Sequence, residues 1–236
     1  MPKGFSAVAA AASDINERKN SGGGDFERKK YLRLPNDGDR ATVRFLESGD
    51  EVTSAWCHIA PHPKIQWGIK IPCRDQDAET GERIGADCPG CEKGYKRVFQ
   101  GWINLIQRDA PVYETDENGK PDYNSIVGTE DQVLLWQSGI NVFEDLQFQD
   151  ETYGLESREF IIRRRGTGKN TSYNIVAVDG GPTKLSKADA DLAEGKYDLN
   201  AIVTPPDYET WGKTREETES SEQAPVKESP FASKRR

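Results

Sequence analysis

Apolar residues are scarce in this sequence, and long hydrophobic runs are missing. Of its 236 residues, 34% are hydrophobic and 31% are charged, and there is a single methionine. The stretch after Met1 lacks the apolar length of a signal peptide or a membrane span, so we expect a soluble, cytoplasmic protein without a membrane partner. A large helical bundle is also disfavoured. Low hydrophobicity with abundant glycine and proline favours one folded core flanked by unfolded segments.

Histidine is scarce too, and familiar catalytic motifs are missing. The chain has two histidines, which leaves few candidates for general acid–base catalysis. It has no P-loop, no Gly-x-Ser-x-Gly motif and no dinucleotide-binding fingerprint. It also lacks the His-x-Glu that nucleic-acid deaminases combine with Cys-x-x-Cys around a catalytic zinc. We therefore predict that the protein is not an enzyme.

The four cysteines are the most informative residues that are present. Cys88-Pro89-Gly90-Cys91 places two thiols on one tight turn, with proline and glycine between them as such a turn favours. Cys73 lies a short loop upstream. Clustered cysteines in a reducing compartment indicate metal binding more than disulfides. We predict one structural zinc ion, held in a closed Cys₃His shell by Cys73, Cys88, Cys91 and a histidine.

The fourth ligand is less certain, because both histidines precede the loop. His58 lies in a strand-like run that would hold a ligand rigidly, so it is the first choice. His62, between two prolines, is the alternative, and Cys57 is also near. The cysteines could instead be small buried residues, but a Cys-x-x-Cys set in turn residues makes that the weaker interpretation.

Strand-like patterns predict strands over 31–34, 41–46, 52–59, 131–137, 159–165 and 171–178, and one helix is expected over 139–149. The stretch over 95–107 is apolar and aromatic, and residues 102–106 within it are predicted to form a buried strand. The segment 68–91 is assigned to a metal-binding loop, and 114–125 to an exposed loop. We predict a mainly β protein with some helix (α+β), an OB-fold-like Greek-key barrel with an inserted zinc-binding loop. The predicted domains are a flexible arm with a short helix (1–28), a core (29–205) with a zinc subdomain (about 56–100), and a disordered, mostly acidic tail (206–236).

Charge is unevenly distributed along the chain. The net charge is −8, yet residues 158–170 carry five cations and one acid, whereas residues 207–222 carry six acids and two cations. Aromatic residues alternate with cations around the metal loop and in the hairpin over 159–178. Single strands are held by cations along the phosphates and by rings that stack on bases. The candidate DNA-binding residues are Lys64, Trp67, Lys70, Lys93, Tyr95, Lys96, Arg97, Arg163, Arg165 and Tyr173.

Two blocks of motifs resemble a known family. The first is residues 41–46 followed by a histidine, Cys73 and residues 88–94, which begin with Cys88-Pro89-Gly90-Cys91. The second comprises residues 136–140, 153–154, 158–160 and 165–168. Over roughly residues 29–180 the chain resembles the zinc-containing, OB-fold single-stranded DNA-binding proteins of tailed bacteriophages, such as the helix-destabilising protein of the T-even phages. The resemblance implies nonspecific coating of single strands in phage DNA replication, recombination and repair, in the host cytoplasm. It also implies self-association on DNA, and replication or recombination partners bound through the tail.

Two other functions remain open at this level. A zinc-ribbon module of a replication or transcription complex would use the same cysteines to bind protein rather than DNA. A zinc-dependent nucleic-acid enzyme would need an open coordination position, which a Cys₃His shell does not leave.

Overall fold

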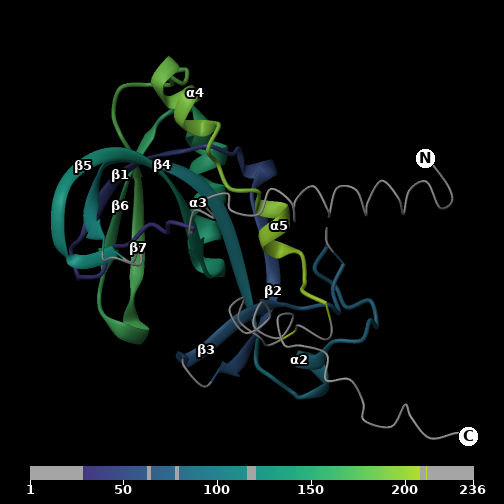
Figure 1. Cartoon of the computed structure of the whole chain (residues 1–236). Coiled ribbons are helices and arrows are strands. Elements are labelled where there is room, and N and C mark those ends of the chain that lie inside the picture. Colours follow the sequence, from purple (N-terminus) through teal and green to yellow (C-terminus); the bar gives the residue numbers. More distant parts are fainter. Residues whose placement is uncertain (1–28, 63–64, 78–79, 116–120, 208–210, 212–236) are drawn as a thin grey trace, which may run out of the picture. The chain divides into compact units, whose positions relative to one another are not determined.

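The structure is a computed structural model that describes residues 29–62, 65–77, 80–115, 121–207 and 211 (Figure 1). Contacts divide the chain into Met1–Lys30 and Tyr31–Arg236. The predicted arm (1–28) and nearly all of the predicted tail beyond 207 lie outside the described residues. No helix in the described part of the chain is long and apolar enough to cross a membrane.

The second unit is built on one antiparallel sheet with the order β3-β2-β4-β1-β6-β7, and β5 pairs with β4 off this path. Its few helices are short, apart from α3. The predicted mainly β fold with some helix is therefore confirmed, whereas the OB-fold assignment stays a prediction. The strands are β1 (Arg40–Phe45), β2 (Thr53–His62), β3 (Ile65–Pro72), β4 (Arg97–Thr115), β5 (Pro121–Ser138), β6 (Glu159–Arg165) and β7 (Ser172–Ala177), and the helices are α2 (Pro89–Glu92), α3 (Ile140–Tyr153), α4 (Lys187–Ala193) and α5 (Leu199–Val203), with 3-10 turns η1 (Gly49–Glu51), η2 (Leu155–Ser157) and η3 (Gly168–Asn170).

Two predicted loops contain strands instead. β3 takes up the first part of the predicted metal loop, and β4 and β5 extend as a ribbon through most of the predicted loop over 114–125. The ribbon is held by cross-strand pairs: the rings of Tyr113 and Tyr123 lie 5.1 Å apart, and Ser125 Oγ donates to Glu114 at 2.8 Å. Turn-type composition is a local signal, whereas these contacts depend on register between distant residues.

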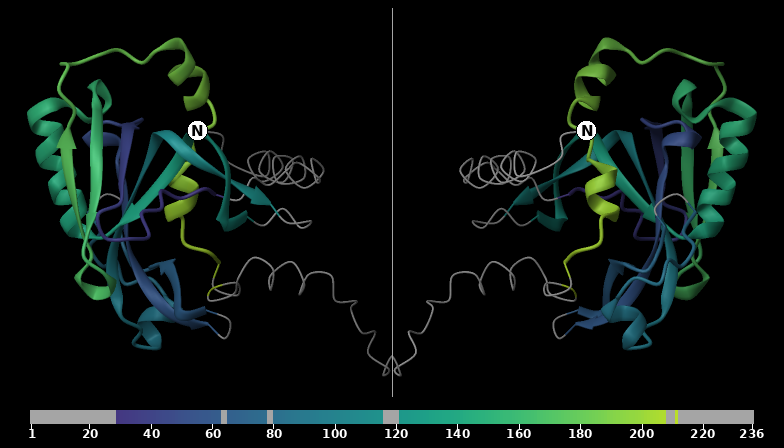
Figure 2. Two further views of the ribbon diagram at one scale, coloured as in Figure 1. Left: turned by 90° about the vertical axis from the view of Figure 1, so that its left-hand side faces the viewer. Right: turned by 90° about the vertical axis from the view of Figure 1, so that its right-hand side faces the viewer.

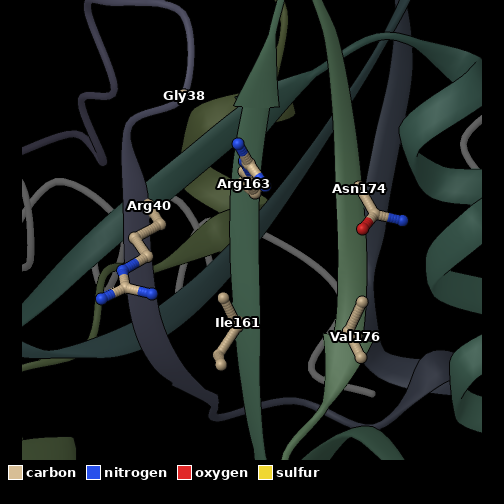
Figure 3. A pocket seen from close by; sticks show the side chains of 6 residues that line it. All are labelled: Gly38, Arg40, Ile161, Arg163, Asn174 and Val176. Atoms are coloured by element: carbon tan, nitrogen blue, oxygen red, sulfur yellow. The ribbon is translucent and has the colours of Figure 1, made fainter.

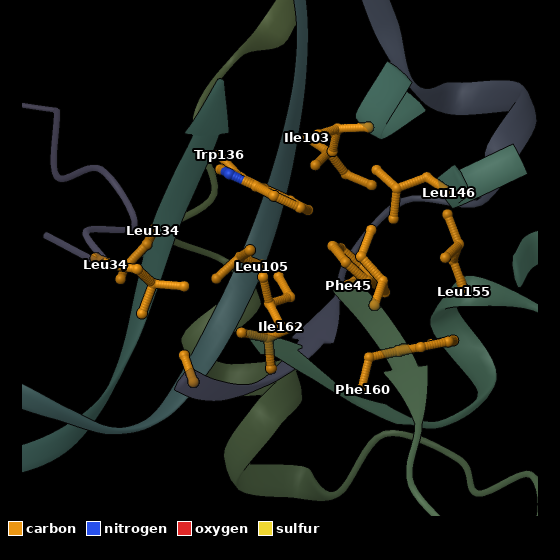
Figure 4. Packing of buried hydrophobic residues seen from close by; sticks show 14 residues of the cluster. Leu34, Phe45, Ile103, Leu105, Leu134, Trp136, Leu146, Leu155, Phe160 and Ile162 are labelled. Atoms are coloured by element: carbon orange, nitrogen blue, oxygen red, sulfur yellow. The ribbon is translucent and has the colours of Figure 1, made fainter. Parts of the chain in front are cut away.

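Apolar side chains from β1, β4, β5, β6 and β7 meet in one core, which α3 closes (Figure 4). Alternation along β1 sends Ala41, Val43 and Phe45 inward, because successive side chains of a strand point to opposite faces. The Phe45 ring lies 6.3 Å from Trp136 and 5.4 Å from Phe160. This core fixes the strands whose outer face carries Arg163.

A second, smaller core lies on the opposite face of β4, where the C-terminal segment packs (Figure 2). Leu199 of α5 contacts Cys57, Trp102 and their neighbours, while α3 covers the other face. Polar contacts fix the same segment: Asn104 Nδ2 donates to the Tyr197 carbonyl, and the Tyr197 amide donates back to Asn104 Oδ1, both at 3.0 Å. The sequence predicts no element in this segment, since α4 and α5 are too short to show a helical period.

Arg108 of β4 joins three acidic residues from different elements. Its guanidinium lies 2.5 Å from Asp189 in α4, 2.7 Å from Glu159 and 2.8 Å from Asp131. The hydrogen bonds from Arg108 lower the pKa of Asp189, against the opposing effect of burial. A depressed folded-state pKa means that this carboxylate contributes stability above its unfolded value, about 4, and that the contribution is lost as pH falls through the folded value.

We therefore expect Asp189→Asn to lower the unfolding free energy at pH 7 by about 1–3 kcal/mol, since a hydrogen-bonded charge is lost. The difference in unfolding free energy between the variant and the unaltered protein should shrink as pH falls below about 4. Urea denaturation at pH 7, 5 and 3 measures both. A difference that is the same at all three pH values would show that the charge of Asp189 contributes nothing.

Candidate functional site

Three segments bring one histidine and three cysteines together. His58 lies in β2, Cys73 directly follows β3, Cys88 directly precedes α2, and Cys91 lies within α2. One ligand atom from each lies within 4.8 Å of all the others. The pairing of β2 with β3 places Ile71 opposite His58, so Cys73 comes two residues beyond on the same face.

The spacing of these atoms suits a tetrahedral metal. Cys73 Sγ lies 3.8 Å from Cys88 Sγ and 3.7 Å from Cys91 Sγ, and His58 Nε2 lies 3.3 Å and 3.4 Å from the sulfurs of Cys73 and Cys91. A tetrahedron with metal–sulfur bonds of about 2.3 Å has edges of about 3.8 Å. The four residues could therefore hold a metal ion, and would leave no open position on a tetrahedral one.

The histidine is oriented by a backbone acceptor. His58 Nδ1 lies 3.0 Å from the Tyr95 carbonyl oxygen. A carbonyl only accepts, so Nδ1 carries the proton and Nε2 presents its lone pair to the sulfurs. A second hydrogen bond of the metal ligand is the usual way in which proteins fix the tautomer of a coordinating imidazole.

Two of the three thiols in the group, Cys73 and Cys91, lie in surroundings that oppose ionisation. Burial raises the pKa of Cys73 to about 12 and also raises the pKa of Cys91. Burial acts on Cys88 in the same direction, but backbone donors at Cys91, Arg74 and Gly90 lower the pKa of Cys88 overall. A metal ion binds thiolates, so metal binding here would release protons.

Gly90 lies where a side chain has no room. A methyl group on its Cα would collide with the His58 ring and come within 2.8 Å of the Trp211 ring. We expect Gly90→Ala to weaken metal retention, because overpacking typically lowers the free energy of unfolding by about 1–3 kcal/mol. Competition with a chromogenic chelator measures the effect. Gly139→Ala is the control, because its methyl would meet nothing within 4 Å, and equal metal retention in both variants would contradict this account.

Trp211 covers the cluster from a distant part of the sequence. It is 8% exposed, and its ring stacks on Tyr95 at 6.0 Å and meets His58 edge-on at 6.1 Å. Arg74 helps to hold the preceding chain by donating to the Pro206 carbonyl at 2.9 Å. Trp211 falls within the predicted disordered tail (206–236), and no local sequence pattern marks it as buried.

The other two candidate ligands do not join the cluster. Cys57 is fully buried next to His58 in β2, but strand alternation turns it to the opposite face, where it packs with Trp102 and Leu199. Burial raises its pKa to about 12. His62 lies four residues beyond His58, at the end of β2, outside the group of four.

The candidate DNA-binding residues near the group of four ligands differ in their exposure and contacts. Lys93 and Lys96 are exposed beside α2. Lys70 is exposed too, and its Nζ donates to Gln100 at 2.8 Å. Lys64 and the side chain of Trp67 lie outside the described residues.

Arg97 and Tyr95 have contacts within the protein itself. The Arg97 guanidinium lies 5.2 Å from the Trp56 ring and donates to the Gly81 carbonyl at 3.3 Å. Tyr95 is covered by Trp211. A base could stack on this face of Tyr95 only after the indole moved away.

The hairpin of β6 and β7 separates residues that the sequence analysis grouped. Arg163 and Arg165 are exposed on one face. Tyr173 pairs with Arg164, so it lies on the other face, where its ring meets Trp136 at 5.6 Å. This corrects the predicted position of Tyr173 beside the two arginines. The Arg164 guanidinium donates to the backbone carbonyls of Leu34 at 2.6 Å and Pro35 at 2.7 Å.

The structure adds Arg40, which the sequence analysis missed. Register places it directly opposite Arg163, and both line a hollow with Asn174 and Val176 (Figure 3). Arg40 stands alone in the sequence near Asp37 and Asp39, so no run of cations marked it. Comparison with protein-family models, with curated proteins and with solved structures finds no match.

Proposed function

We propose that the group of four ligands holds one structural zinc ion. Three sulfurs and one imidazole suit zinc better than the hard cations that prefer oxygen. When bound, the ion would tie β2, the end of β3 and α2 together. His58, Cys73, Cys88 and Cys91 would be its ligands, so the ion would support the fold rather than take part in a reaction.

We further propose that the protein binds single-stranded DNA without sequence preference and without enzymatic activity. The exposed arginines of β6 carry this proposal. Arg163 and Arg165 have no ion-pair partner in the described part of the chain, although the protein as a whole is acidic, with a net charge of −8. Unpaired cations on an acidic protein favour an anionic ligand. The exposed Lys93 and Lys96 beside α2 add to this charge.

The motif resemblance supports the same proposal and extends it. We propose a phage protein that coats and protects single strands during DNA replication, recombination and repair. Self-association on DNA and recruitment of replication proteins through the tail over 206–236 belong to the same proposal.

Titration with a single-stranded oligonucleotide and with its duplex, followed by tryptophan fluorescence at two salt concentrations, tests DNA binding. We expect the single strand to quench fluorescence and its affinity to fall steeply with salt, because each phosphate contact releases counterions. An affinity that does not change with salt would contradict the proposal. No response to either ligand would favour a zinc-ribbon module that binds protein.

We expect Trp211→Ala to speed the loss of zinc to a chelator by about tenfold while leaving one zinc per chain before the challenge. The indole covers His58 and Tyr95 without being a ligand, so its loss would open the centre to water. The rate of zinc transfer to a chromogenic chelator measures this. Trp211→Phe keeps a stacking ring, so its rate of zinc loss should lie between those of the unaltered protein and Trp211→Ala. Equal rates in all three proteins would contradict the covering role of Trp211.

A further inference from the structure

Three strands align a row of polar side chains across their outer face. Register pairs Arg40 of β1 with Arg163 of β6, and Arg163 with Asn174 of β7. The next row on the same face has Ile161 opposite Val176, because side chains two residues apart point the same way. These residues, together with Gly38, line a hollow of about 440 Å³ (Figure 3).

The cations of this face form no ion pair within the described part of the chain. Arg40, Arg163 and Arg165 are exposed, and none of them is ion-paired with a described residue. The nearest acids in the sequence accept hydrogen bonds from backbone amides: Asp37 from Gly166 at 2.8 Å, and Asp39 from Asn36 at 2.7 Å. Among the described residues, the three guanidinium groups are thus available to an external anion.

The arrangement of Arg40 and Arg163 is unfavourable by itself. Like charges directly opposite on neighbouring strands destabilise a sheet, and an acid at either position would instead form a cross-strand pair. Asn174, on the other side of Arg163, is neutral and does not reduce the repulsion between the two arginines. A bound anion would remove this repulsion, so the row suits a surface that works with a ligand in place.

The hollow also limits what the ligand can be. No aromatic residue of the described part of the chain lines it, and its apolar part is made by Ile161 and Val176, the latter 50% exposed. It therefore offers cations and an aliphatic floor, with no ring for base stacking. The other end of the face is closed: Arg44 is buried there and donates to Thr183 Oγ1 at 2.7 Å. A ligand that follows the cations must run from Arg40 and Arg163 toward Arg165.

We infer that this hollow binds the phosphodiester backbone of the single strand, with Arg40, Arg163 and Arg165 contacting phosphates and the bases left unread. The inference rests on the proposed function and adds Arg40 to the interface. Arg163 and Arg165 lie two residues apart, about 7 Å along an extended strand. An extended polyanion can contact the three arginines through successive phosphates, whereas inorganic phosphate offers a single one.

The double variant Arg40→Gln/Arg163→Gln tests the inference in the full-length protein. With a thirty-nucleotide thymidine strand we expect its affinity to fall at least tenfold. The slope of log affinity against log salt should become shallower by about 1.4, since each phosphate contact on a single strand contributes about 0.7. Lys184→Gln/Lys187→Gln is the matched control, because it removes two exposed cations elsewhere and should leave both quantities close to those of the unaltered protein.

The outcomes separate the two claims. If the unaltered protein binds the strand and the double variant binds equally well, the inferred site is wrong while the proposed function stands. If the unaltered protein does not bind the strand at all, both are wrong. Millimolar inorganic phosphate should compete weakly, and competition as strong as that of the strand would reassign the hollow to small phosphates. Binding of polyglutamate with the same dependence on Arg40 and Arg163 would overturn the inference in favour of an acidic protein.

Discussion

Cys88→Ser should yield a protein without stoichiometric zinc and with a loosened segment over 73–94. Cys88 is the N-cap residue of α2, and its Sγ lies 3.8 Å from the Sγ of Cys73. A serine hydroxyl does not ionise near neutral pH and is a poor zinc ligand, so three ligands would remain. Structural zinc sites in small domains contribute about 10–16 kcal/mol of apparent binding free energy at pH 7, and this energy also folds the segments that carry the ligands.

The segments around the four candidate ligands contribute few buried apolar residues. In the described part of the chain, the small apolar cluster nearest the ligands has Ala60, Ile71 and Trp211 as its buried residues, with Ile69 and Tyr95 against it. Asp75 accepts hydrogen bonds from the amides of Ile84 and Gly85, but these close a loop rather than build a core. Loss of the metal should therefore loosen this region while the main core stays folded.

Zinc content per chain, measured by elemental analysis, and limited proteolysis test this prediction. The unaltered protein should hold one zinc and resist cleavage over 73–94, whereas Cys88→Ser should hold none and be cleaved there. Cys57→Ala is the matched control, because Cys57 is also a buried thiol but lies outside the group of four, and it should retain one zinc. A Cys88→Ser protein that keeps its zinc against a chelator would overturn the proposed centre.

The four candidate metal ligands could be named from sequence because their signal is mostly local. A Cys-x-x-Cys set in turn residues defines its own geometry, and Cys73 lies close enough in the chain to join it. The choice of His58 depended on an expected strand, and the structure places its Nε2 within 3.4 Å of two sulfurs. Trp211 could not be found, since it meets the cluster from more than a hundred residues away.

The surface residues show where this kind of reasoning fails. A run of three arginines is visible in the sequence, but which of them are free depends on what faces them. Arg164 binds carbonyls, while Arg40 gains its place opposite Arg163 only through the pairing of β1 with β6. Tyr173 looked like a stacking ring because alternation along a single strand does not say which face is the core.

Phe160→Ala should destabilise the main core by about 3–5 kcal/mol without removing the zinc. Phe160 is fully buried in β6, where Val43 and Ala177 flank it on the neighbouring strands. Its ring fills the space beside Phe45 at 5.4 Å. Removing it leaves a cavity that a sheet paired on both sides cannot close. A loss of this size is a large share of the 5–15 kcal/mol that typical domains possess.

Urea denaturation followed by far-ultraviolet circular dichroism measures the loss, and zinc content of the native protein is the second readout. Phe160→Leu should cost much less, because leucine fills part of the same space, and Ile126→Ala, at a side chain 61% exposed, should have little effect. Cys88→Ser and Phe160→Ala would then have opposite effects on metal content and core stability. Cys88→Ser removes the metal and leaves the core, whereas Phe160→Ala weakens the core and leaves the metal. An unfolding free energy within 1 kcal/mol of the unaltered protein would show that Phe160 does not support the sheet that carries Arg163.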